Sequence, residues 1–175
     1  MTDNTRLIRF TAAGLNELVL AKNQGLKGEI THVAAGTGRY NPTGAETALQ
    51  AEKQRVAVND YEDLGGANLR IAALFDGPLE YEVGEFGFFL STGTLLGVYS
   101  QADVLQTYKA ASARILQRFT LNLSALPTDS VTVVVGNENL NLLMTVEIAE
   151  LATASVDNMA RHVGLLLRVM ELEGK

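Results

Sequence analysis

Acidic side chains in two short clusters are the residues of this chain best suited to do chemistry. The clusters are Asp60, Glu62 and Asp63, and Glu80, Glu82 and Glu85. Paired carboxylates can transfer protons or hold a hard cation such as Ca²⁺. Side chains alternate along a strand, however, which places Glu80 and Glu82 on one face and Glu85 on the other. We therefore expect a solvated acidic edge, and a small carboxylate- or metal-dependent enzyme is the weakest of the functions considered.

Other reactive groups are few and scattered. His32 and His162 are the two histidines, and they form no HxxxH pair that would favour a zinc site. His32 falls in a strand pattern and is expected to be a structural group. The absence of cysteine excludes disulfides, thiolate catalysis and cysteine-bound zinc. The serines lack the glycines of a nucleophile elbow. The sequence thus predicts no catalytic residue, no metal ligand and no cofactor.

A glycine-rich stretch, Gly36 to Gly44, partly resembles the sequence of a phosphate-binding loop. The Walker pattern needs a lysine and a serine or threonine directly after its last glycine, where this chain has Ala45 and Glu46. The stretch is better explained as a loop whose glycines shape the backbone. Within it, the residues from Asn41 to Gly44 have the chemistry of a type I turn, with Pro42 in its second position.

The net charge of −6, with a pI near 4.9, argues against binding to nucleic acid, which requires a basic surface. No stretch approaches the roughly 20 apolar residues of a membrane span. The first ten residues are polar and do not form a signal peptide. We expect a protein that is made and kept in the cytosol, or in a particle assembled there.

Periodicity predicts an α+β fold. Thr11 is a plausible N-cap for a short helix that reaches Asn23. Period-two patterns then favour a mostly antiparallel, sandwich-like body, with 101–113 as a loop or short helix. The expected strands are 30–35, 55–58, 69–75, 85–90, 95–99, 115–123 and 131–135. The strand 85–90 should be buried on both faces, with Gly87 admitting a close neighbour. We place a body at 1–140 and an association helix at 141–175.

A heptad pattern marks the predicted C-terminal helix, from about Thr145 to Leu172. Its seam has 3-4 spacing and consists of Ala149, Ala152, Val156, Met159, Val163, Leu166 and Met170. Such a seam predicts self-association, and docking of the helix on its own domain is the alternative. Valine at a and leucine or methionine at d favours two strands, whereas apolar flanking residues suit a larger bundle or a helix with two neighbours. His162 flanks the seam.

Several segments also occur in a familiar order. They are Phe10–Leu15, Ile30–Gly38, the turn around Pro42, the strand Glu85–Phe89, and the hairpin and strand Ser91–Tyr99. In this order, residues 5 to 136 resemble the N-terminal, particle-proximal part of phage tail-collar fibre proteins, as in P2-like phages and related contractile bacteriocins. The resemblance implies a non-enzymatic, trimeric domain that fixes a tail fibre to the baseplate.

The resemblance also implies partners and a location. The partners are further copies of the chain and a baseplate or distal tail-fibre protein, and the location is a virion or phage-tail-like particle. Family members usually continue into a long shaft and a receptor-binding tip, whereas this sequence ends after one helix. We therefore expect the attachment part of a split fibre, an adaptor for another fibre, or a fragment of a longer fibre protein. The first alternative is a receptor- or glycan-binding module that uses the loop Gly36 to Gly44 and nearby acids.

Overall fold

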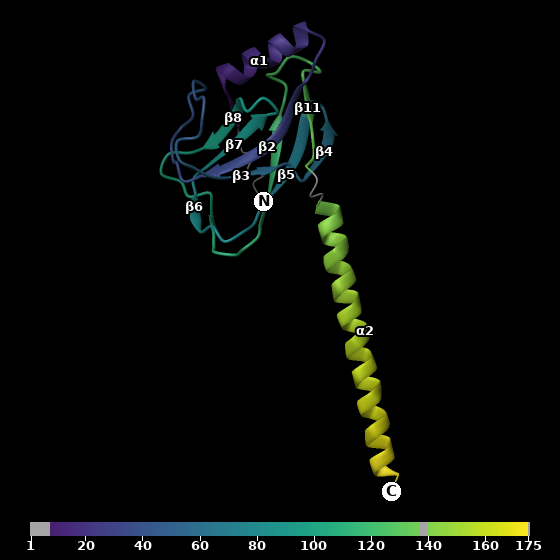
Figure 1. Ribbon diagram of the computed structural model, residues 1–175. Helices are drawn as coiled ribbons and strands as arrows, with labels where there is room; N and C mark the ends of the chain where they lie inside the picture. The colour runs from purple at the N-terminus through teal and green to yellow at the C-terminus, as the bar shows by residue number, and fades with distance from the viewer. Residues whose placement is uncertain (1–7, 137–139, 175) are drawn as a thin grey trace. The chain divides into compact units, whose positions relative to one another are not determined.

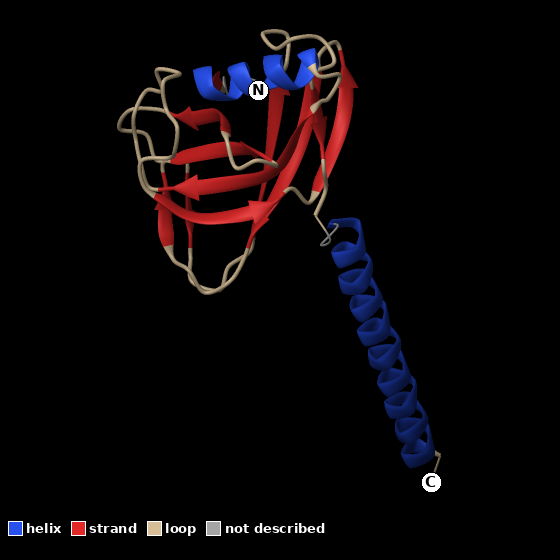
Figure 2. Cartoon of the chain, turned by 45° about the horizontal axis from the view of Figure 1, so that its top comes forward, coloured by secondary structure: helices blue, strands red, loops and turns tan. Residues whose placement is uncertain are grey.

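The computed structural model describes residues 8–136 and 140–174, with side chains in the C-terminal helix from residue 151 onward. The chain divides into two units, Met1–Asn137 and Glu138–Lys175. The first unit holds the strands and a short helix, and the second holds one long helix (Figures 1 and 2). The predicted α+β class, with a mostly antiparallel body, a short N-terminal helix and a long C-terminal helix, is confirmed.

Three sheets build the first unit. The largest has the order β1 (Arg9–Phe10), β8 (Leu95–Ser100), β7 (Glu85–Leu90), β2 (Gly28–Gly36) and β11 (Val131–Val133), and β3 (Glu52–Ala57) also pairs with β2. The second has the order β10 (Ile115–Asn122), β5 (Asn68–Phe75) and β4 (Asp60–Gly65). The third joins β6 (Tyr81–Val83) to β9 (Thr107–Lys109). The described strand pairs are antiparallel except for β11 with β2.

Aromatic side chains join the two larger sheets. Phe119 of β10 lies edge-on to Phe86 and Phe88 of β7, with ring centroids 4.9 and 5.0 Å apart. Phe75 of β5 adds a tilted ring 6.0 Å from Phe86. Offset and edge-to-face contacts of this kind are the favoured geometry for aromatic pairs. The inner faces of the sheets therefore form one continuous core, as a sandwich requires.

Strand β7 is buried along its whole length, as predicted. Phe86 and Phe88 point into the main core, whereas Phe89 packs in a second cluster with Ala34, Leu49, Leu95 and Val98. Leu49 belongs to the loop of residues 37–51, so this loop covers the outer face of the sheet. A Cβ on Gly87 would lie only 2.9 Å from Leu49 Cδ2, which explains the glycine.

Helix α1 (Ala12–Asn23) begins where the sequence predicts. The Thr11 hydroxyl accepts a hydrogen bond from the Gly14 N–H at 3.0 Å, which is N-cap geometry. Leu18 is fully buried beneath the helix. A Cβ on Gly14 would approach Leu96 Cα to 2.6 Å, so this glycine permits close packing of α1 on β8.

Four expectations about local structure were wrong. Residues 101–113 contain β9, and the acidic segment Asp60–Gly65 forms β4, a strand that the sequence analysis missed. Helix α2 spans Leu140–Glu173 and so begins earlier than residue 145. The last strand, β11, ends at Val133 rather than at residue 135. At the predicted turn, the Gly44 N–H donates to the Glu46 carboxylate at 2.7 Å. Among the described residues, no helix is long and apolar enough to cross a membrane.

Candidate functional site

Helix α2 exposes the seam that the sequence predicts. The described seam side chains are strongly exposed within the single chain: Val156 64%, Met159 67%, Val163 55%, Leu166 51% and Met170 67%. Ala152 is also exposed. Ala149 lies in the first turns of the helix, where side chains are outside the described residues. The seam is thus a continuous apolar stripe with nothing of its own unit to cover it.

The apolar surface of α2 is wider than the seam. Five further side chains are between 47% and 75% exposed: Leu151, Leu165, Leu167, Val169 and Leu172. Four charged residues of this part of the helix, Asp157, Arg161, Arg168 and Glu171, recur with heptad spacing on one stripe away from the seam, whereas Glu173 falls at the next d position and ends the seam. The e and g positions that flank the seam from residue 151 onward carry no Asp, Glu, Lys or Arg, and His162 occupies one of the g positions. The arrangement is typical of a helix with more than one apolar neighbour.

His162 lies beside the seam at a g position and is exposed. It lines a shallow hollow on the surface of α2 together with Ser155, Asn158 and Met159. In coiled coils, side chains at g positions can influence which helices pair and in which orientation. His162 occupies such a position beside the exposed seam.

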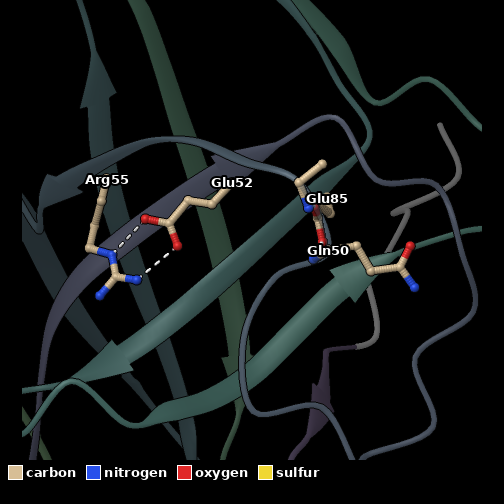
Figure 3. A network of polar contacts seen from close by, with 5 residues as sticks. Gln50, Glu52, Arg55 and Glu85 are labelled. Carbon is tan, nitrogen blue, oxygen red and sulfur yellow. Dashed lines mark hydrogen bonds and ion pairs between the residues drawn. The ribbon is translucent and has the colours of Figure 1, made fainter.

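The second candidate surface is the loop of residues 37–51, which a buried carboxylate holds in place. Glu85 is 0% exposed, and its oxygens accept hydrogen bonds from the backbone N–H groups of Gly38, Gln50 and Ala51 at 3.2, 3.1 and 2.7 Å. Figure 3 shows Glu85 beside Gln50, near the end of the loop. Because a buried carboxylate is costly unless it is hydrogen-bonded, the loop and Glu85 stabilise each other.

The glycines of this loop are explained by the same side chain. A Cβ on Gly36 or Gly38 would lie 2.5 or 2.7 Å from Glu85 Oε1. The prediction of a backbone-shaping loop is consistent with this packing. The carboxylate occupies the place where a phosphate would have to meet the backbone N–H groups, so this loop has no room for a phosphate in the described conformation.

A tyrosine and a serine secure the start of the loop. The Tyr40 N–H donates to Ser100 Oγ at 3.1 Å, and the same hydroxyl lies 3.1 Å from the carbonyl oxygen of Gly84. The Tyr40 hydroxyl is buried, and no described group lies at a distance and angle that would make a hydrogen bond with it. Burial, followed by the negative charge of Glu85, raises the pKa of Tyr40 well above its usual range. The phenol therefore stays neutral beside the buried carboxylate.

A second carboxylate orders the tip of the loop. Glu46 accepts hydrogen bonds from the N–H groups of Thr43 and Gly44, both at 2.7 Å. Partial burial alone would raise the pKa of Glu46, but these hydrogen bonds outweigh it and the pKa lies below its ordinary value. The carbonyl oxygen of Gly44 in turn accepts the Ala12 N–H at 2.7 Å. The tip is thereby joined to the first turn of α1.

Three other acidic side chains of the two clusters form separate pairs. Glu82 is paired with Arg39, and Glu80 accepts a hydrogen bond from Tyr108. On β4, Glu62 is paired with Arg70 at 2.9 Å. Over the part of the chain that the structure describes, no three His, Asp or Glu side chains gather as metal ligands would. The expected solvated edge describes Glu80 and Glu82, but Glu85 is buried.

Two further polar side chains, His32 and Arg55, lie on β2 and β3. His32 is exposed on β2, and its Nδ1 lies 2.8 Å from Thr31 Oγ1. On β3, Arg55 forms a two-bond contact with Glu52 (Figure 3) and stacks over the Phe89 ring at 3.6 Å. Arg55 thus extends the cover over the outer face of β7.

No protein-family model matches the chain, and neither the curated proteins nor the solved structures include a significant match.

Proposed function

We propose that this protein is a structural, non-enzymatic component of a phage tail or phage-tail-like particle. It associates with further copies of itself through α2, three copies forming the unit. Its β-rich body attaches to a baseplate protein or to a distal tail-fibre protein. The order of sequence segments from Phe10 to Tyr99, which resembles tail-collar fibre proteins, supports the particle and the partners.

The exposed seam of α2 is the observation that carries the proposal. Burying an exposed Leu, Val or Met side chain contributes about 1.5–3 kcal/mol, less in proportion to the area already covered. Burial of the five described seam side chains, which are 51–67% exposed, would therefore stabilise an association by several kcal/mol per chain. Most of the stability of a helix comes from packing of its apolar face. A helix of 34 residues with this much apolar surface needs a partner along its length.

Three copies suit the width of the apolar face. A two-stranded seam buries the a and d positions and normally carries charged residues at e and g. In α2 the e and g positions from residue 151 onward carry no Asp, Glu, Lys or Arg, with His162 as their one titratable residue, and Asp157, Arg161, Arg168 and Glu171 lie on the opposite stripe. A bundle of three helices covers these flanking positions and leaves the charged stripe in water.

The anchored loop is the proposed attachment surface of the body. Loops of this length without secondary structure are uncommon unless they serve a function. Glu85 and Glu46 hold this loop in a defined shape, while its outward residues, such as Asn41, Thr43 and Thr47, remain exposed. A preformed loop can bind a partner without first losing conformational entropy.

Charge placed in the seam tests the association. We expect the double substitution Val163→Lys and Leu166→Lys to reduce the mass in solution to that of one chain, 18.8 kDa, by light scattering. The matched control, Asp157→Lys with Glu171→Lys, puts two lysines in the charged stripe and should leave the mass unchanged. An unaltered mass for the seam variant would refute the role of the seam.

A further inference from the structure

The three-stranded sheet of the body has two free edges. Its order is β10, β5 and β4, and each end strand pairs with β5 and with no other described strand. A strand at the edge of a sheet presents a row of backbone N–H and C=O groups that can pair with another chain. This sheet can therefore be extended on both sides.

Strand β10 has few of the features that protect an edge. Its eight residues contain no glycine or proline, and its register with β5 is unbroken from Ile115 to Asn122. Natural proteins block edges with bulges, prolines or charges, whereas β10 carries one charged residue, Arg118. A hollow of about 630 Å³ lies beside Thr120 and Asn122, between β10 and residues 8–10. The strand is therefore open to an extended segment of another chain.

Strand β4, the other edge, is acidic. It carries Asp60, Glu62 and Asp63 and no basic residue. Glu62 is paired with Arg70 of β5 at 2.9 Å. A hollow of about 520 Å³ lies between β4 and β11, the nearest edge of the larger sheet (Figure 1). This edge is thus also uncovered by the described part of the body.

The two edges carry opposite charges at the same level of the sheet. Arg118 of β10 and Asp60 of β4 both lie opposite Ala72 of β5. Their side chains point away from the core, because Ile71 and Ala73, on either side of Ala72, are fully buried in it. Neither Arg118 nor Asp60 forms an ion pair with a described residue. Each edge thus has a charge that the other can neutralise.

The direction of the strands allows β10 of one copy to pair with β4 of the next. Each runs antiparallel to β5, so β10 and β4 run in the same direction. A closed ring of three copies repeats one contact between two different surfaces of the chain. Rotation about an axis along the strands keeps their direction and moves no copy along that axis. Residues at the same level of the two edges are thereby brought side by side.

We propose that the bodies of neighbouring copies join through β10 and β4, as a parallel pair in which Arg118 faces Asp60 of the next copy. Backbone hydrogen bonds supply the affinity, and the charged pair favours one register. Three such pairs close a ring, so the inference rests on the three copies of the proposed function. It adds a contact between copies that does not involve the seam of α2.

Disulfide trapping tests this pairing, because the unmodified chain has no cysteine. Positions 62 and 120 lie level on the two edges, both opposite Arg70. Within one chain they are two strand spacings apart, about 9.5 Å, which is too far for an internal disulfide. We expect oxidised full-length Glu62→Cys with Thr120→Cys to run as a covalent trimer on a denaturing gel without reductant. Either single variant should run as one chain.

A second double variant supplies the control. Glu62→Cys with Tyr108→Cys moves one thiol to β9 and should remain a single chain on the gel. Equal cross-linking in the two double variants, or covalent dimers of Thr120→Cys alone, would overturn the pairing. A mass of three chains by light scattering without covalent trimers would also overturn it, while leaving the proposed function standing. A mass of one chain would overturn both.

Charge reversal gives a second readout. In the Glu62→Cys and Thr120→Cys background, Arg118→Glu places two acids side by side, and the rate of disulfide formation should fall roughly fivefold. Adding Asp60→Arg restores opposite charges and should recover most of that rate. Equal rates with and without the reversals would contradict the contact between Arg118 and Asp60.

Discussion

Two carboxylates, Glu85 and Glu46, show how single residues hold an irregular loop in shape. Each accepts hydrogen bonds from backbone N–H groups, and each joins segments that the strands do not connect. Hydrogen bonds to an ionised acceptor are about twice as strong as neutral ones. The loop of residues 37–51 therefore depends on charge as much as on the packing of Leu49.

Neutralising the buried carboxylate should destabilise the body. In Glu85→Gln one oxygen becomes an NH₂ group, which faces backbone donors and cannot accept their hydrogen bonds. We expect a loss of about 2–3 kcal/mol in the free energy of unfolding, measured with urea at fixed protein concentration. Glu82→Gln, the same change at an exposed ion pair, should cost less than about 1 kcal/mol. Equal losses in the two variants would contradict the anchoring role of Glu85.

The second carboxylate should make the loop sensitive to acid. The pKa of Glu46 is lowered in the folded protein, so its contribution to stability is complete above the ordinary carboxyl pKa of 4.5. That contribution is lost as the pH falls through the lowered value. Glu46→Gln should therefore be less stable than the unmodified protein at pH 7, and the difference should shrink near pH 3. A difference that stays constant with pH would contradict this account.

Sequence patterns located the seam residues but not the loop anchor. Val156, Met159 and Val163 could be found because a helix repeats its environment every seven residues. Glu85 could not, because its partners lie 34 to 47 positions earlier in the chain and contribute only backbone N–H groups. Spacing among neighbouring acids carries no information about such contacts.

At the scale of elements, strands were predictable where their burial alternates or is complete. The pattern of β10 follows from one more buried face and one exposed face, whereas β7 is buried on both faces and β5 is exposed only at Arg70. By contrast, β4 is mostly exposed and acidic, and β9 has three residues. Neither has the apolar alternation that marks a strand, because pairing with a neighbour rather than burial holds them in place.

A glycine inside α2 provides a test of which face of the helix is free. Gly164 lies on the charged stripe, and no atom lies within 4 Å of the position its Cβ would take. Gly164→Ala should therefore stabilise the helix by about 0.5–1 kcal/mol per chain without altering the mass. The measurement is thermal unfolding followed by circular dichroism at 222 nm. A lower midpoint would mean that position 164 is packed in the assembly, against the seam assignment.

At the scale of the whole molecule, the two units differ in how they bury apolar surface. The body encloses its own core, in which Phe86, Phe88 and Phe119 meet. Helix α2 has no such core within its own unit, and in the proposed function its apolar seam is covered by other copies of the helix. The sequence could indicate association through its heptads, but seam chemistry at Val156, Met159 and Val163 favours two strands while the uncharged flanks favour more. The seam residues alone therefore do not determine how many chains the proposed assembly contains.

The absolute mass of the unmodified chain in solution tests the central claim most directly. Sedimentation equilibrium over a range of micromolar concentrations should give three times the chain mass of 18.8 kDa, falling only on dilution as the helices dissociate. A mass of two chains would retain the seam but contradict the trimer. A single-chain mass across the whole range would contradict association through α2, and with it the proposed function.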